Sequence, residues 1–219
     1  MYFQIVDPES AGVNVLSEQR GPAPKRTYQK AKRAEDEWRT RERIVDAAEY
    51  LHGTLGPART TVSAIAGRAG VTRATVYRHF ATEESLFLAC SRQWLSRQQL
   101  PQPDAWGRIE DPIERLRAGL LDIYRYYRVG EPMLAHIHHD VDAVPAVVVA
   151  ARHSREQLWL NTLLAPHPSH RKTVRAAIAH ATAFTTWQSL CSAQGLSHRS
   201  AVELMTAMVK HISPSTRPN

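Results

Sequence analysis

Apolar residues recur at intervals of three and four along most of the chain, and this period predicts helices. The first such helix spans about residues 41–51, and Gly53 and Gly56 end it. Four apolar side chains share one of its faces: Ile44, Ala47, Ala48 and Leu51. Beyond residue 86, amphipathic runs alternate with proline and glycine, and no strand-like alternation of any length occurs. The pattern therefore predicts an all-α protein.

Prolines and glycines divide the second half of the chain into further helices. Asp111 and Pro112 form a cap followed by a proline at the first helical position. Gly130 is expected to end that helix, and Pro132 to open a short one. The expected helices span residues 82–98, 111–129, 131–139, 144–164, 169–193 and 197–212.

The stretch from Thr60 to Leu86 has the spacing of two short helices joined by a tight turn. Ala66 is small enough for two helices to cross closely, and Gly70 can take a positive φ. Thr72 is placed to cap the second helix. Four apolar side chains are expected to point inward: Ile65, Val71, Val76 and Phe80. The stretch predicts a helix-turn-helix.

The outward face of the second short helix carries no acidic residue. Its side chains combine guanidinium, hydroxyl, phenol and imidazole groups, which suit phosphate oxygens and base edges in a major groove. They are Arg73, Ala74, Thr75, Tyr77, Arg78 and His79. We expect Arg73 and Thr75 to read bases, and Tyr77 and His79 to hold phosphates.

The same motifs resemble the N-terminal domain of TetR-type bacterial transcriptional regulators over about residues 41–88. The matching positions are Thr61-Val62, Ile65-Ala66, Ala69-Gly70-Val71, Thr75 to Phe80, Thr82 and Leu86. The resemblance implies a three-helix DNA-binding domain followed by a helical ligand-binding and dimerisation domain. It also implies that Thr61, Thr72 and the outward face contact an operator. Where such regulators usually carry a phosphate-binding lysine, this chain has Glu83, followed by Glu84. Two acidic residues in the first turn of a helix are stabilised by the positive end of the helix dipole, so we expect them to cap the helix.

The resemblance further implies a homodimer that binds a palindromic operator as a repressor and is released by a small-molecule inducer. Two-fold symmetry suits this role, because one short helix covers only a few base pairs. The last two long helices are expected to pack against a second copy. The faces expected to do so carry Val174, Ile178, Ala181, Thr185, Val202, Met205, Val209 and Ile212.

Large aromatic side chains gather on the helices expected after residue 90. Such side chains with a few polar tips are typical of small-molecule pockets, although aromatics at helical spacing also form ordinary core. The residues expected to line an inducer pocket are Tyr124, Tyr127, Met133, His136, Trp159, Phe184 and Trp187.

A histidine-rich segment, His136 to Asp142, also has side chains that suit zinc. On one helix His136 and His139 share a face while His138 points elsewhere, and no matching His/Glu pair stands out. We therefore expect no metal site, and no cofactor other than an unidentified inducer.

Charge is concentrated around the predicted DNA-reading helices. The chain carries a net charge of +7, of which residues 25–92 contribute +5. We divide it into a flexible basic arm (1–35), a helix-turn-helix domain (36–84), a helical ligand-binding and dimerisation domain (85–213) and a tail (214–219). The arm either lies in the minor groove beside the main site or is a solvated tail.

Several other classes of protein are disfavoured by what the sequence lacks. Cys90 and Cys191 form neither a disulfide framework nor a zinc motif. No window is apolar enough for a membrane helix, and no export signal begins the chain, so we expect a cytoplasmic protein. No nucleophile motif or phosphate-binding glycine loop indicates an enzyme. The alternatives are an architectural DNA-binding protein or a metal-dependent helical enzyme.

Overall fold

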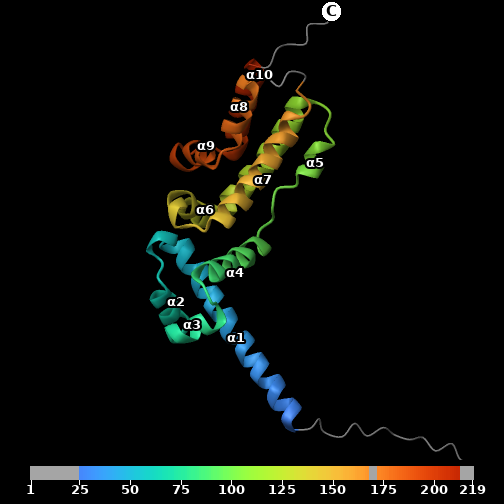
Figure 1. Cartoon of the computed structure of the whole chain (residues 1–219). Helices are drawn as coiled ribbons and strands as arrows, with labels where there is room; N and C mark the ends of the chain where they lie inside the picture. The colour runs from blue at the N-terminus through green and yellow to red at the C-terminus, as the bar shows by residue number, and fades with distance from the viewer. Residues whose placement is uncertain (1–24, 168–171, 213–219) are drawn as a thin grey trace, which may run out of the picture. The chain divides into compact units, whose positions relative to one another are not determined.

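A computed structural model describes residues 25–167 and 172–212, and its regular elements are helices (Figure 1). Within those two ranges there is no strand, and no helix has the length and apolar character needed to cross a membrane. The helices are α1 (Lys25–Thr54), η1 (Pro57–Arg59), α2 (Val62–Ala69), α3 (Arg73–His79), α4 (Glu83–Ser96), α5 (Pro103–Gly107), α6 (Pro112–His139), η2 (Val141–Ala143), α7 (Ala146–Leu164), α8 (Lys172–Thr182), α9 (Phe184–Trp187), η3 (Gln188–Ala193) and α10 (His198–Ile212).

The first helix begins at Lys25, so the expected flexible arm is wrong for residues 25–35. This run contains no glycine or proline and is rich in residues of high helix propensity. An i,i+4 ion pair joins Glu35 to Arg39 at 2.5 Å. Residues 28–39 are exposed on every side, which explains why the sequence shows no apolar period there. Residues 1–24 lie outside the described ranges. Contacts divide the described chain into two units between Arg39 and Thr40.

A first hydrophobic core joins the second half of α1 to α2, α3 and α4. The apolar face expected on α1 is buried, and Val76 and Phe80 from the α3 region pack into the same core. Cys90 adds a buried thiol from α4. This core confirms the arrangement predicted for the helix-turn-helix region, and it holds α3 with its other face outward.

A second, larger core is built around α6, which packs against α5, α7, α8 and α10. Tyr124 and Tyr127 lie within it and donate hydrogen bonds to the carbonyl oxygens of Ala181 (2.9 Å) and Thr182 (2.7 Å). Those carbonyls belong to the last turn of α8, whose backbone acceptors have no partner within the helix. The two phenols therefore satisfy carbonyl groups at the C-terminus of α8 as well as fill the core.

The expected break at Gly130 does not occur, because α6 continues through Pro132 to His139. A Cβ on Gly130 would lie 3.0 Å from both the Trp94 ring and the Leu134 side chain. This glycine therefore permits close packing and does not end the helix. Pro132 only removes the hydrogen bond that its nitrogen would have donated to the carbonyl of Arg128.

The expected helix over residues 169–193 is also divided. α8 ends at Thr182, Ala183 has extended backbone (φ −69°, ψ 138°), and the chain continues as α9 and the wider turns of η3. No proline or glycine marks this break, and the expected start at 169–171 lies outside the described ranges. The short helix α5, which was not expected, is held by the buried Trp106, whose indole donates to Asp122 at 3.0 Å.

The faces expected to contact a second copy are largely buried within this chain. α8 and α10 turn these faces toward α6 and toward each other, so the apolar period marked the core of the chain itself. The buried residues are Val174, Ile178, Ala181, Val202, Met205 and Val209. Of the expected set only Thr185 and Ile212 are exposed.

Candidate nucleic-acid interface and ligand cavity

The turn between α2 and α3 has the geometry that its sequence predicts. Thr61 caps α2 by accepting the N–H of Ala64 at 3.1 Å. Gly70 follows α2 with φ 66° and ψ 41°, a left-handed conformation that glycine adopts without strain. The Val71 N–H then closes the turn by donating to the Ala66 carbonyl at 3.0 Å. These bonds fix the angle at which α3 leaves α2.

The start of α3 is held by two threonines. The Thr72 hydroxyl accepts the Thr75 N–H at 3.1 Å, which confirms the expected cap. The two hydroxyl groups also lie 3.0 Å apart, in hydrogen-bonding contact. The first turn of α3 is therefore rigid, with the Thr75 hydroxyl already engaged by Thr72.

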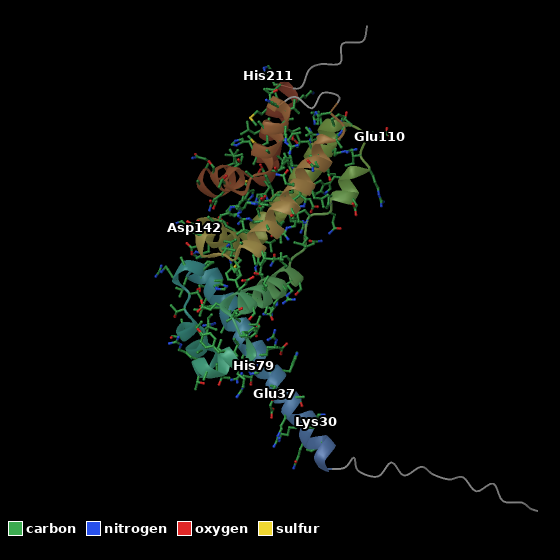
Figure 2. All side chains as sticks on the ribbon, in the orientation of Figure 1. Lys30, Glu37, His79, Glu110, Asp142 and His211 are labelled. Atoms are coloured by element: carbon green, nitrogen blue, oxygen red, sulfur yellow. The ribbon has the colours of Figure 1, made fainter. Side chains whose placement is uncertain are left out.

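The rest of α3 places most of the expected DNA-binding residues at the surface. Arg73, Ala74, Tyr77 and Arg78 are exposed, and His79 is half-buried at the end of the helix (Figure 2). The Tyr77 hydroxyl donates to the Glu83 carboxylate at 3.5 Å. α3 itself contains no acidic residue, so its outward face is a row of cationic and hydroxyl groups.

Sequence reasoning missed Arg41, which supports the end of α3. Its guanidinium lies 4.0 Å from the centroid of the Phe80 ring, and its Nη1 donates to the His79 carbonyl at 2.9 Å. A cation at a helix C-terminus also complements the helix dipole. The only signal in the sequence is its position on α1, one turn before the buried Ile44.

The start of α4 forms a reciprocal cap between Thr82 and Ser85. The Ser85 N–H donates to the Thr82 hydroxyl at 3.1 Å, and the Thr82 N–H donates to the Ser85 hydroxyl at 3.3 Å. Glu83 and Glu84 lie in the first turn, where the helix dipole favours negative charge. Both carboxylates therefore have a structural role, and Glu83 also engages the phenol of α3.

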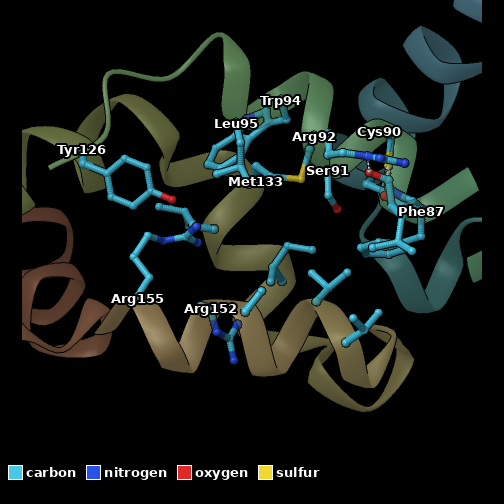
Figure 3. A pocket seen from close by; sticks show the side chains of 17 residues that line it. Phe87, Cys90, Ser91, Arg92, Trp94, Leu95, Tyr126, Met133, Arg152 and Arg155 are labelled. Atoms are coloured by element: carbon cyan, nitrogen blue, oxygen red, sulfur yellow. Dashed lines mark hydrogen bonds between the residues drawn. The ribbon is translucent and has the colours of Figure 1, made fainter. Parts of the chain in front are cut away.

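A cavity of about 210 Å³ lies between α1, α4, α6 and α7 (Figure 3). Its walls are mostly apolar side chains, among them Phe87, Leu95, Met133, Leu134, Ile137 and Val148. At one end burial lowers the pKa of His52 to about 4 and raises that of Cys90 to about 12, and the two side chains are 3.4 Å apart. At the other end lie Tyr126, Arg152 and Arg155.

The residues expected to line an inducer pocket lie in several places. Met133 lines the cavity of Figure 3. Tyr127 and Phe184 border a second hollow beside His138 and Glu156, and His136 borders a third beside Asp140. The other three, Tyr124, Trp159 and Trp187, are buried in the core. Sequence reasoning missed Tyr126 on α6 and the two arginines of α7, Arg152 and Arg155. The spacing of these arginines is typical of a solvated helix face.

The histidine-rich end of α6 is divided among different partners. His138 stacks on Phe184 with ring centroids 4.7 Å apart, and His139 pairs with Asp140 at 2.6 Å. Over the described ranges no three histidine, cysteine or acidic side chains gather as a metal site.

Asp140 connects the end of α6 to the turn that precedes α2. Its side chain is only 8% exposed, and its Oδ2 accepts the Ala58 N–H at 3.0 Å. The bonds from His139 and from that N–H lower the pKa of Asp140. Gly56 lies against the same carboxylate with φ 87° and ψ 157°. We call this set of bonds the Asp140 contact.

Comparison with known proteins places the helix-turn-helix region in a family. Residues 44–90 match the family model for bacterial regulatory proteins of the tetR family. The probable acrEF/envCD operon repressor of Escherichia coli K12 is 33% identical over 84 residues, 38% of each chain. The match thus spans well under half the length of that curated relative and is confined to one part of it.

Solved structures resemble the chain over more of its length. NalD, the secondary repressor of the MexAB-OprM multidrug efflux pump in Pseudomonas aeruginosa, superposes with a TM-score of 0.55 at 20% identity, covering 84% of this chain and 100% of that one. A TetR-like transcriptional regulator from Rhodococcus sp. RHA1 gives 0.56 at 17% identity, covering 78% and 94%. At these identities the likeness shows the fold.

Proposed function

We propose, from the premise that residues 44–90 make this chain a TetR-type regulator, that it represses transcription by binding DNA and is controlled by a small molecule. The single observation that carries the proposal is α3. It is capped by Thr72, supported by Arg41 and exposes Arg73, Tyr77 and Arg78 without an acidic residue among them. An exposed helix of this kind fits a major groove.

Within the groove, the first turn of α3 faces the bases in this proposal. Arg73 is exposed beside Ala74, which is small enough for close approach to a thymine methyl group. Tyr77 and His79 hold phosphates, and for this Tyr77 exchanges the Glu83 carboxylate for a phosphate oxygen. Thr61 and Thr72 lie at the N-termini of α2 and α3, where backbone N–H groups also favour phosphate.

We further propose that the protein acts as a homodimer through exposed side chains of α8 and α10 on a palindromic operator in the cytoplasm. Leu204 and Ile212 on α10 are 47% and 38% exposed. The small Ala176 on α8 and Ala207 on α10 are exposed as well. Such a dimer doubles the contacts of one short helix.

The test is fluorescence anisotropy on DNA from upstream of the gene, with scrambled DNA as competitor and a series of salt concentrations. Binding is expected to resist the competitor and to weaken steeply with salt, because cationic side chains displace counterions from phosphates. Equal affinity for both DNAs would contradict sequence-specific repression and favour an architectural role.

Two variants separate the roles of residues on α3. Arg73→Ala is expected to relax the preference at one operator position by about 1–3 kcal/mol, as for loss of a bidentate base contact. Tyr77→Ala should weaken binding to all sequences. Arg108→Ala removes an exposed charge at the end of α5 and serves as the control. Unchanged affinity in both α3 variants would contradict the assignment.

A further inference from the structure

The cavity of Figure 3 has mostly apolar walls, with Arg152 and Arg155 at one end and the polar side chains of His52, Ser91 and Arg92 towards the other. Arg152 and Arg155 are three residues apart on α7, and both border the cavity. The Arg155 guanidinium points toward Tyr126 in Figure 3, and its charge acts on that phenol. A largely apolar space with two arginines at one end suits an amphiphile with an anionic head, because Arg92 towards the other end is exposed and already donates to the Leu88 carbonyl.

Three buried nitrogen atoms of these two guanidinium groups lack a hydrogen-bond acceptor in the described part of the chain. Nε and Nη1 of Arg152 and Nε of Arg155 are buried, and no residue of the described ranges accepts a hydrogen bond from them. Oε1 of Glu156 lies 3.7 Å from the Arg152 Nε, which is close enough for an ion pair but too far for a hydrogen bond. A buried cationic donor without an acceptor is costly, whereas an incoming anion would satisfy it with charge-assisted hydrogen bonds.

Neighbouring side chains report an excess of positive charge at this end. Burial, together with the charges of Arg152 and His153, lowers the pKa of His138 to about 4. Burial raises the pKa of Glu156, and the same two groups together with Arg155 oppose that rise. The Glu156 carboxylate therefore balances only one of the two positive charges of Arg152 and Arg155, and one further negative charge would balance the other.

The geometry points to a small organic monoanion as the ligand of this cavity, with its carboxylate against Arg155 and Arg152 and its apolar body between α4 and α6. Binding of the anion is inferred from the cavity itself. Only its role as a regulator of DNA binding rests on the proposed function. The volume of about 210 Å³ accommodates on the order of seven to ten non-hydrogen atoms at roughly 20–30 Å³ each. Octanoate and benzoate are of about that size.

The test is isothermal titration calorimetry of the full chain with octanoate and benzoate, each against its neutral alcohol, 1-octanol or benzyl alcohol. At least one carboxylate should bind about tenfold or more tightly than its alcohol. Equal binding of acid and alcohol, preference for octylamine, or no binding of either carboxylate would overturn the inference.

Four variants locate the anion. Arg155→Gln replaces the guanidinium by a shorter, uncharged polar side chain, and it should lower carboxylate affinity by about 10- to 100-fold. Arg155→Lys keeps the charge and should lose less, while Arg108→Gln removes a charge outside the cavity and should leave affinity unchanged. Circular dichroism confirms folding of each variant. Undiminished affinity in both Arg155→Gln and Arg152→Gln would overturn the assignment.

Calorimetry needs no DNA, so its outcome is independent of the proposed function. Carboxylate binding without operator binding would refute the repressor and leave the cavity assignment standing. Operator binding without carboxylate binding would do the reverse. If both occur, adding the carboxylate to the anisotropy assay measures whether occupancy weakens operator binding.

Discussion

The Asp140 contact gives a quantitative prediction for Gly56→Ala. A Cβ at this position would lie 2.3 Å from the Asp140 Oδ2, and the backbone conformation at φ 87°, ψ 157° is nearly restricted to glycine. The backbone strain costs about 1–3 kcal/mol. Displacing Asp140 also loses the bond from the Ala58 N–H, worth roughly 1–1.5 kcal/mol at this partly solvated position. We expect the free energy of unfolding to fall by about 2–4 kcal/mol.

A double-mutant cycle separates the two contributions. Asp140→Ala removes the carboxylate without touching the backbone of Gly56, so Gly56→Ala in that background should cost only the backbone strain. The expected coupling is about 1 kcal/mol or more. Urea unfolding followed by circular dichroism measures all four proteins.

The matched control is Gly67→Ala on α2. A Cβ there meets no atom within 4 Å, and the position is helical and exposed, so the substitution should raise stability by about 0.5–1 kcal/mol. A neutral Gly56→Ala would show that the turn is not held in this conformation. Additive effects in the cycle would show that Asp140 and Gly56 are not in contact.

Two further predictions concern buried titratable groups. In the folded protein a thiol reagent should modify Cys191 before Cys90, because burial raises the pKa of Cys90 to about 12; equal rates for the two thiols in Cys191→Ser and Cys90→Ser variants would contradict this. Burial holds the pKa of both His52 and His138 near 4, whereas in the unfolded chain both imidazoles protonate near pH 6.5. The contribution of the neutral imidazoles to the free energy of unfolding is therefore fully present above pH 6.5 and is lost as pH falls toward 4. The stability slope should be at most roughly 1.4 kcal/mol per pH unit for each imidazole, and His138→Gln should reduce it in unfolding measurements across that window.

The helix-turn-helix was predictable because its determinants are local. Gly70 fixes the turn, Thr72 caps the next helix, and Ala66 permits the crossing, each through its own backbone or a near neighbour. The same holds for the cap at Thr82, although its partner Ser85 was not foreseen. Arg41 could not be assigned in this way, because its partner His79 lies 38 residues away.

The second half was harder to predict because distant contacts decide its local structure. The sequence predicts that Gly130 ends a helix, because the close contact with the Trp94 ring that explains this glycine involves a residue 36 positions earlier in the chain. The period of α8 and α10 shows that one face is buried, yet only the three-dimensional packing shows that α6 covers it. The two arginines of the cavity have an ordinary surface spacing, and their burial depends on α4 and α6.

Pro132 gives α6 a mechanical property that follows from its missing N–H. The helix has already lost the bond to the Arg128 carbonyl, so bending at that level breaks one interaction fewer than bending elsewhere. The segment beyond the proline carries Met133 and Ile137 in the cavity wall and ends at Asp140, which binds the turn before α2. This segment is short and can tilt at the proline, so a displacement of the cavity wall at Met133 and Ile137 would move Asp140 and the turn that it binds.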